Sequence, residues 1–158
     1  MILISACLAG CKCRYDGRSN PHLVAIQLVE QGLALPVCPE QLGGLKTPRP
    51  PAEIAGGHGG DVLDQKARVV NKDGTDVTWE FVRGAWECLR LAKLTRAKLA
   101  VLKSQSPSCS VEEVHDGTFS GQVRPGPGVT TALLQQHGFE VLDETDLEQV
   151  ARRLGPGS

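Results

Sequence analysis

The 158-residue chain has no apolar stretch near the length of a membrane span. A transmembrane helix takes about 20 consecutive apolar residues, whereas glycine, proline or charged residues interrupt every apolar run here after a few positions. The amino-terminal run stops at Gly10, Cys11 and Lys12, so it lacks the long apolar core of a secretion signal. We therefore expect a cytoplasmic protein that does not bind a membrane.

The chain also lacks an excess of charge of either sign. Its 17 basic residues nearly balance its 18 acidic ones, so no broad field would attract a polyanion. A local basic group has helical spacing and is typical of a solvated helix face: Arg90, Lys93, Arg96 and Lys98. We expect no nucleic acid partner, and a monomer or small homo-oligomer.

A third absence is the CxxC pair, although the chain has 6 cysteines. Structural zinc sites usually draw on such pairs, so a zinc knuckle is disfavoured. A chain of this length buries an ordinary core without disulfides. In a reducing compartment the cysteines are then expected to be reduced, metal-bound or catalytic.

Three cysteines come shortly after short apolar runs typical of buried strands. Cys7 follows residues 2–6, Cys38 follows residues 34–37, and Cys109 lies in the loop after residues 99–102. If these runs are parallel strands, their carboxyl ends meet at one sheet edge, where open α/β sheets bind ligands. The fold class predicted is α/β: a single-domain, three-layer, Rossmann-like parallel sheet with helices on both faces and a small β-hairpin.

The remaining elements follow from apolar periodicity and turn residues. Ser19 or Asn20 is expected to cap the first helix, with Pro21 in its first position and Gly32 at its end, and Thr78 to cap the next. Further helices are expected over 79–95, over 129–137 and from 145 or 146 to 154, and a fourth strand over 139–142. A hairpin is expected to pair 62–70 with 75–78 and to turn at Asp73-Gly74. Loops over 39–60 and 115–127 are expected to cover the site. One domain spans 1–158, with 154–158 as a frayed tail.

Thiolates bind zinc, cuprous ion and iron-sulfur clusters. A cubane cluster held by three cysteines keeps one iron open to water or substrate, which makes it a Lewis acid. Other interpretations stay open at this point: the three cysteines are buried small hydrophobes, or Cys7, Cys11 and Cys13 form a local site. Cys88 has the spacing of a helix core position.

Several motifs together resemble the DUF523 family over nearly the whole chain. They are Ser5-Ala6-Cys7-Leu8, Cys13-Arg14-Tyr15-Asp16-Gly17, Cys38-Pro39-Glu40 with Gly43-Gly44, Thr47-Pro48-Arg49-Pro50-Pro51-Ala52-Glu53, Leu102-Lys103, Ser106-Pro107-Ser108-Cys109 and Asp116-Gly117-Thr118-Phe119-Ser120-Gly121. That family includes a thiouracil desulfidase. The resemblance implies non-redox removal of sulfur from a thiolated nucleobase such as thiouracil, with release of sulfide, at a [4Fe-4S] cluster with three cysteine ligands and one open iron.

Carried onto this chain, the resemblance implies that Cys7, Cys38 and Cys109 hold the cluster. Glu40 and Ser106 are the candidates for acid-base work, and four residues are candidates for binding the small thiolated heterocycle: Arg14, Tyr15, Asp16 and Arg49. The chain has Ser110 where the family usually has glycine, which puts the backbone there in doubt. Cys13 matches a variable position, often valine, which argues against an indispensable ligand.

Two other functions fit the same cysteines. A non-catalytic iron-sulfur or metal-binding module would bind iron without releasing sulfide from a thio-base. A cysteine persulfide sulfur carrier would need one reactive thiol and no iron. Metal analysis and a sulfide-release assay separate these alternatives from an iron-sulfur-dependent desulfidase.

Overall fold

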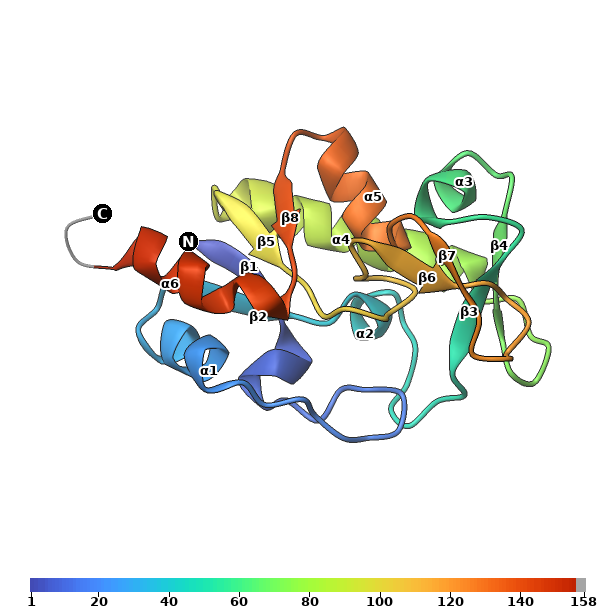
Figure 1. The fold of residues 1–158 in the computed structure, drawn as a ribbon, viewed down its shortest axis with the longest axis horizontal. Helices are drawn as coiled ribbons and strands as arrows, with labels where there is room; N and C mark the ends of the chain where they lie inside the picture. Colours follow the sequence, from blue (N-terminus) through green and yellow to red (C-terminus); the bar gives the residue numbers. More distant parts are fainter. Residues whose placement is uncertain (156–158) are drawn as a thin grey trace.

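The computed structural model describes residues 1–155, and a four-stranded parallel sheet forms its centre (Figure 1). In spatial order the strands are β2 (Ala34–Val37), β1 (Ile2–Ser5), β5 (Leu99–Val101) and β8 (Glu140–Leu142). Leu3 pairs with Leu35 on one side and with Ala100 on the other. The predicted parallel sheet is confirmed, with the strand ends that precede Cys7, Cys38 and Cys109 at one edge.

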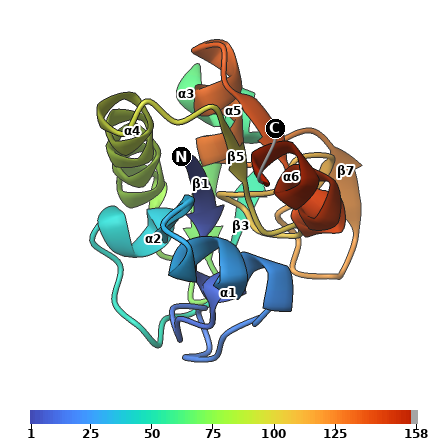
Figure 2. The same cartoon turned by 90° about the vertical axis from the view of Figure 1, so that its left-hand side faces the viewer.

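Two helices cover each face of the sheet (Figure 2). They are α1 (Leu23–Glu30) and α6 (Leu147–Leu154) on one face, and α4 (Thr78–Leu94) and α5 (Val129–Gln136) on the other. Successive strand residues point to opposite faces, so Ile2 and Ile4 are buried with α1 and α6, while Leu3 is buried with α4 and α5. The predicted three-layer α/β arrangement is therefore confirmed.

Two helices begin differently from the prediction. The first begins at Leu23 with His22 in the N-cap position, later than Pro21, and the Asn20 side chain accepts a hydrogen bond from Arg14 instead of capping the helix. Thr78 is the first residue of α4, and its hydroxyl accepts the backbone N–H of Val69 at 2.9 Å. Both polar side chains join the helix to a neighbouring segment.

The predicted loop over 39–60 contains regular structure. It holds α2 (Pro39–Leu42), β3 (Ala52–Ala55) and the start of α3 (Gly59–Leu63). The proline run ends at Pro51, so an antiparallel ladder can form directly after it. His58 and Asp61 form a reciprocal cap that begins α3 within the glycine-rich run.

The predicted hairpin of 62–70 with 75–78 is wrong. The strand β4 (Arg68–Asn71) pairs with β3, and the segment after the turn contributes a single bridge between Val70 and Asp76. The turn itself forms, because Gly74 N–H donates to the Asn71 carbonyl at 2.9 Å. The predicted turn is therefore confirmed, but the strand that pairs with β4 lies earlier in the chain.

The segment expected to form turns over the site contains a hairpin, β6 (Glu113–His115) with β7 (Val123–Pro125). Short 3-10 helices follow β1 and β8, at Ala6–Ala9 and Glu144–Asp146. The β3–β4 pair, the β6–β7 hairpin and α3 lie at the end of the molecule away from the two termini (Figure 1). They extend the structure beyond the sheet edge that carries the cysteines.

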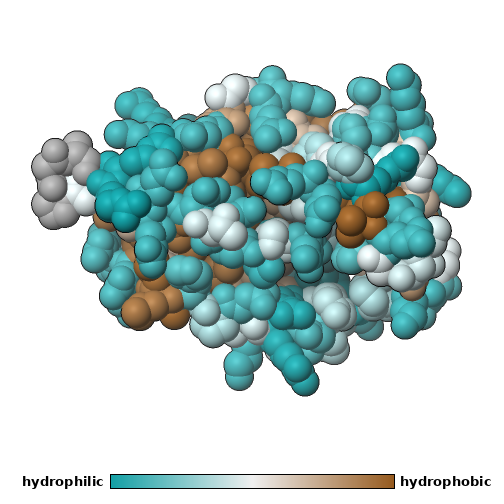
Figure 3. Space-filling model, in the orientation of Figure 1, coloured by the Kyte–Doolittle hydropathy of each residue, from teal (hydrophilic) through white to brown (hydrophobic). Residues whose placement is uncertain are grey.

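The surface is mainly hydrophilic on the face drawn in Figure 3. No helix within residues 1–155 is both long and apolar enough to cross a membrane. The closing helix α6 reaches Leu154, and residues 156–158 of the predicted frayed tail lie outside the described part of the chain.

Candidate functional site

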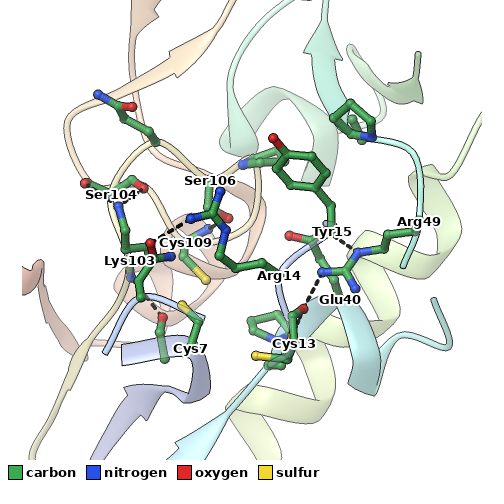
Figure 4. Close-up of a pocket in the computed structure, with 18 of the residues that line it drawn as sticks. Cys7, Cys13, Arg14, Tyr15, Glu40, Arg49, Lys103, Ser104, Ser106 and Cys109 are labelled. Carbon is green, nitrogen blue, oxygen red and sulfur yellow. Dashed lines mark hydrogen bonds and ion pairs between the residues drawn. The ribbon is translucent and has the colours of Figure 1, made fainter. Parts of the chain in front are cut away.

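A cavity of about 490 Å³ lies at the sheet edge formed by the carboxyl ends of the strands. Four cysteines line it: Cys7, Cys13, Cys38 and Cys109. Figure 4 shows the labelled thiols around a common space, with Arg14, Tyr15 and Glu40 beside them. The structure thus brings together the three cysteines singled out by strand position and adds a fourth.

The first two predicted ligands are placed directly by strand ends. Cys7 lies in the 3-10 turn that follows β1, and its carbonyl accepts the N–H of Asn20 at 2.9 Å. Cys38 follows β2 as the N-cap residue of α2. Because β1 and β2 are paired in register from Ile2 to Ser5, the two thiols come from neighbouring positions on one sheet edge.

The third predicted ligand lies in a loop held by side-chain hydrogen bonds. The Ser106 hydroxyl oxygen accepts the N–H groups of Ser108 and Cys109, each at 3.1 Å. The buried Thr131 hydroxyl of α5 donates to the Cys109 carbonyl at 2.8 Å. Ser106 therefore lines the cavity and shapes the Cys109 turn, and no residue within 1–155 accepts a hydrogen bond from its hydroxyl group.

Ser110 replaces the family glycine without a strained backbone. Among the described residues, the non-glycine positions with positive φ are Gln65, Arg96, Gln105 and Phe119, so Ser110 is not one of them. Its buried hydroxyl donates to the Glu113 carbonyl. Serine is accommodated because this position does not need the left-handed conformation that favours glycine.

Hydrogen bonds of Cys13 with Cys7 and Cys38 shift the pKa values of these thiols in opposite directions. A hydrogen bond from Cys13 is the main cause that lowers the pKa of Cys7 to about 7, and it likewise lowers the pKa of Cys38 to about 7. Hydrogen bonds to Cys38 and Cys7 raise the pKa of Cys13. Burial raises the pKa of Cys109, so two of the four thiols have a lowered pKa and two a raised one.

Glu40 faces the cavity from the first turn of α2, with its side chain 17% exposed. Burial raises the pKa of Glu40, and the charge and hydrogen bond of Arg49 partly oppose that shift. Arg49 Nε lies 3.0 Å from Glu40 Oε1, and its Nη2 donates to the Cys13 carbonyl at 2.9 Å. Arg49 lines the cavity with its guanidinium already bound to protein acceptors.

Close helix packing fixes the position of Glu40. At Gly84 of α4, an added Cβ would lie 2.0 Å from the carbonyl oxygen of Pro39. At Gly43, after α2, an added Cβ would lie 1.9 Å from the carbonyl oxygen of Glu80. Glycine at both positions allows α2 to pack against α4, which places Cys38 and Glu40 over the sheet edge.

The other predicted substrate residues are placed unequally. Arg14 and Tyr15 line the cavity, and the Arg14 guanidinium carbon lies 5.8 Å from the Tyr15 ring centroid. Asp16 is not among the lining residues; its Oδ2 lies 3.2 Å from Arg14 Nη2. Asn20 accepts from Arg14 Nη1 at 2.7 Å, so two neighbours orient this guanidinium.

Sequence reasoning missed further lining residues, notably Lys103 and His115. Lys103 Nζ lies 3.2 Å from Glu144 Oε1, and its backbone N–H donates to Ser5 Oγ at 2.8 Å. The signal for Lys103 was its place directly after a strand. His115 comes from β6, whose contact with the site depends on a hairpin that the sequence did not reveal; its Nδ1 is buried without a hydrogen-bond partner in the described residues.

The donors that line the cavity include several soft thiols, a ligand type that suits iron-sulfur clusters. Within residues 1–155, no three His, Cys, Asp or Glu side chains are arranged to hold a single metal ion. Iron-sulfur clusters take separate cysteine thiolates at separate irons. Cys7, Cys38 and Cys109 come from three different strand ends and line one cavity, which fits that requirement.

Fold and site together define an α/β protein with a cysteine-lined ligand cavity at the carboxyl edge of its parallel sheet. The chain belongs to the 2-thiouracil desulfurase family, which residues 2–146 match. It is 45% identical over 150 residues to the uncharacterized protein YbbK of Bacillus subtilis (strain 168), covering 95% of this chain and 99% of that protein.

A solved structure is also similar. It is that of the [4Fe-4S]-dependent thiouracil desulfidase TudS, a DUF523 protein, with a TM-score of 0.83 and 42% sequence identity. The match covers 97% of this chain and 96% of the TudS chain. The resemblance stated from the sequence motifs is therefore confirmed.

Proposed function

We propose that this protein removes sulfur from a thiolated nucleobase such as thiouracil and releases it as sulfide, without net redox change. The observation that carries the proposal is the shared cavity of Cys7, Cys38, Cys109 and the mostly buried Glu40. Membership of the 2-thiouracil desulfurase family and the similarity to TudS support the same activity.

In this proposal Cys7, Cys38 and Cys109 hold a [4Fe-4S] cluster. When bound, the cluster would supply Lewis-acid activation of the thiocarbonyl group through its iron without a cysteine ligand. The low pKa of Cys7 and of Cys38, about 7 in each case, favours thiolates at two positions before loading. Cys109 loses its proton on ligation, as metal binding to thiols requires.

Glu40 is the proposed general acid-base group. Burial raises its pKa, which brings the carboxylate closer to the proton affinity that suits transfer near neutral pH. The carboxylate takes a proton from the attacking water and returns it to the departing sulfur or the ring. Arg49, at 3.0 Å, orients the carboxylate and acts through it.

Substrate contacts are assigned to the cavity rim. Arg14 and Tyr15 face the cavity and offer a guanidinium and an aromatic ring to a flat heterocycle, while Asp16 acts by holding Arg14. Ser106 donates its free hydroxyl hydrogen to substrate or water. We still expect the substrate to be a small thiolated heterocycle and the protein to act in the cytoplasm without a nucleic acid partner. We also still expect a single domain in a monomer or small homo-oligomer.

The test is anaerobic reconstitution with iron and sulfide, followed by a sulfide-release assay over a panel of thio-bases. Glu40→Gln should abolish release while the iron content and the visible spectrum of the cluster stay unchanged, because the amide cannot exchange the proton. Glu87→Gln, at an exposed position of α4, is the matched control and should keep full activity. Unchanged turnover in Glu40→Gln would remove the proposed role.

The same assay decides between this function and the two alternatives. A non-catalytic cluster-binding module would load iron and release no sulfide from any thio-base. A persulfide carrier would work without iron. Cys109→Ala should lose the cluster and the activity together, since it removes one proposed ligand.

A further inference from the structure

Two residues of the sequence motifs line the cavity without a role in the proposed reaction. Glu53 lies in β3, and Phe119 lies in the loop of residues 116–122 that joins β6 to β7. Aromatic residues are few in this chain, with 3 Phe, 2 Trp and 1 Tyr. Because two of these, Tyr15 and Phe119, line the same cavity, Phe119 is a candidate for contact with a flat ligand.

The carboxylate of Glu53 holds the loop that carries Phe119. Its Oε1 accepts the backbone N–H groups of Gly117 and Phe119, each at 3.0 Å. These partners lie 64 and 66 positions further along the chain. Hydrogen bonds to a charged acceptor are stronger than those between neutral groups. Glu53 therefore ties the loop to β3 at the wall of the cavity.

Close packing at Gly117 fixes the same loop a second time. An added Cβ at Gly117 would lie 2.8 Å from the carbonyl oxygen of Ile54 and 2.8 Å from Cα of Ala55. Gly117 also has a φ of 93°, which a residue without Cβ adopts readily. Since Ile54 is fully buried, the loop rests on a strand that belongs to the core.

The backbone of Phe119 has an uncommon conformation. Its φ of 55° lies in the left-handed region, which bulky residues rarely adopt. Such a conformation persists where the surrounding structure holds it, and it is frequent at ligand sites. Here the hydrogen bond from the Phe119 N–H to Glu53 holds it. A carboxylate on β3 thus sets the direction in which this side chain leaves the loop.

We propose that Phe119 is a substrate-binding residue whose ring stacks on the thiolated heterocycle, and that Glu53 is the residue that positions it. The inference rests on the proposed function and deepens it. Every nucleobase has a flat face that stacks on an aromatic ring, whatever its substituents. Phe119 therefore contributes affinity for a flat heterocycle and takes no part in the chemical step.

The first experiment removes the ring alone. Phe119→Leu keeps an apolar side chain with the same cost at positive φ, and Phe119→Tyr keeps the ring. In anaerobically reconstituted protein, Phe119→Leu should raise the KM for 2-thiouracil about tenfold, in line with base stacking on aromatic residues, and leave kcat within about twofold of wild type. Phe119→Tyr should retain the wild-type values. Ser120→Ala, the exposed next residue, is the matched control and should change neither constant.

Uracil separates binding from turnover, because it has the same ring without the reacting sulfur. Its Kd, measured by calorimetry, should rise in Phe119→Leu by about the same factor as the KM for 2-thiouracil. An unchanged Kd for uracil together with an unchanged KM would overturn the ring contact while sulfide release by wild type stands. Uracil binding that depends on Phe119, in a wild type that releases no sulfide from any thio-base, would refute the desulfidase alone.

The second experiment tests whether Glu53 acts through Phe119. Glu53→Ala should raise both constants about as much as Phe119→Leu, and should speed hydrogen exchange of the amides of Gly117 and Phe119. Glu53→Gln keeps an oxygen acceptor and should restore most of the affinity. Glu113→Ala, an exposed carboxylate on β6, is the control.

Combining the two changes completes this test. If Glu53 acts by placing the ring, the double variant of Glu53→Ala with Phe119→Leu should bind uracil no more weakly than either single variant. Losses of affinity that add in the double variant would overturn the positioning role of Glu53.

Discussion

At the scale of single residues, Arg49 shows how a buried charge organises this cavity. Its side chain is 5% exposed, and it donates to Glu40, to the Thr47 hydroxyl at 2.9 Å and to the Cys13 carbonyl at 2.9 Å. A guanidinium with these bonds has few donors left for a ligand. One side chain thus links the proposed acid-base group to the loop that carries two of the four thiols.

Replacing this arginine tests the link. Arg49→Met removes the cation and leaves Glu40 buried without its partner, which should cost about 3–5 kcal/mol of unfolding free energy. The pKa of Glu40 should rise further, because Arg49 is what opposes the effect of burial. Since the base form of Glu40 would then need a higher pH, the acid limb of the activity profile should move toward higher pH.

Urea unfolding and the pH dependence of sulfide release measure the two effects. Arg18→Met, at an exposed position of the same cavity-side loop, is the control and should change neither. The double variant Glu40→Gln with Arg49→Met should recover part of the stability. An unshifted pH profile in a folded Arg49→Met protein would show that Arg49 does not act through Glu40.

At the scale of elements, the edge strand β8 is joined to β5 beyond the end of their ladder. Glu144, in the turn after β8, accepts the Ser104 N–H at 2.9 Å and lies 3.2 Å from Lys103 Nζ. Although burial raises the pKa of Glu144, hydrogen bonds from Ser104 and the charge of Lys103 lower it below the ordinary value. The folded chain therefore holds this carboxylate ionised more firmly than the unfolded chain does.

The direction in which pH changes the free energy of unfolding follows from the linkage between proton binding and folding. A carboxyl whose pKa is lowered on folding stabilises the fold above its unfolded pKa, and the contribution is lost as the pH falls through the folded pKa. Glu144→Gln should thus cost about 1–3 kcal/mol at neutral pH. The difference from wild type should shrink as the pH falls below the ordinary pKa of glutamate.

Urea unfolding at stepped pH values measures this difference. Glu148→Gln, exposed on α6, should show no comparable pH-dependent loss. A cost that is the same at neutral and acid pH would mean that packing, and not the charge of Glu144, is responsible.

Elements were predictable from the sequence where local pattern and burial agree. Short apolar runs end at Ser5, Val37 and Val101 because each is a buried strand of a parallel sheet, and no long-range information is needed to see that. The β3–β4 pairing could not be predicted, because Ala52–Ala55 carries no strand pattern and its partner follows a helix. Tertiary pairing decided the structure there.

The candidate site likewise has some residues whose placement follows from local sequence and others whose placement depends on the tertiary fold. The placement of Cys7 and Cys38 follows from the ends of paired strands, which the sequence indicates. The role of Arg49 does not, because it depends on a fold of the loop that brings its side chain back to Glu40. The contact of Cys13 with Cys7 and Cys38 likewise requires three-dimensional knowledge of the turn between residues 7 and 20.

At the scale of the whole molecule, the cavity joins three parts of the chain. Its thiols come after β1, after β2 and after β5, and its walls include the hairpin of β6 and β7. A ligand that contacts all three parts binds the folded chain better than the unfolded one, so it stabilises the molecule as a unit. The size of this stabilisation depends on the concentration of the ligand relative to its dissociation constant.

We therefore expect iron removal to lower the unfolding temperature of the entire chain in one transition. Anaerobic thermal unfolding of the loaded and the chelator-treated protein, followed by circular dichroism, measures the shift. Cys109→Ala should unfold at the same temperature with and without iron, because a proposed ligand is missing. Equal midpoints for loaded and iron-free wild type would contradict ligation by the folded cavity.

The hydrogen bond from Lys103 N–H to Ser5 Oγ joins residues 98 positions apart. During synthesis the amino-terminal thiols emerge early, but the cavity closes only after the strand that precedes Cys109 has left the ribosome and paired beside β1. Until then Cys7, Cys11 and Cys13 belong to a cysteine-rich segment whose cavity is incomplete. With Cys7, Cys38 and Cys109 as the proposed ligands, the complete set exists only after Cys109 has been synthesised, so iron delivered to a shorter nascent chain would not give the finished centre.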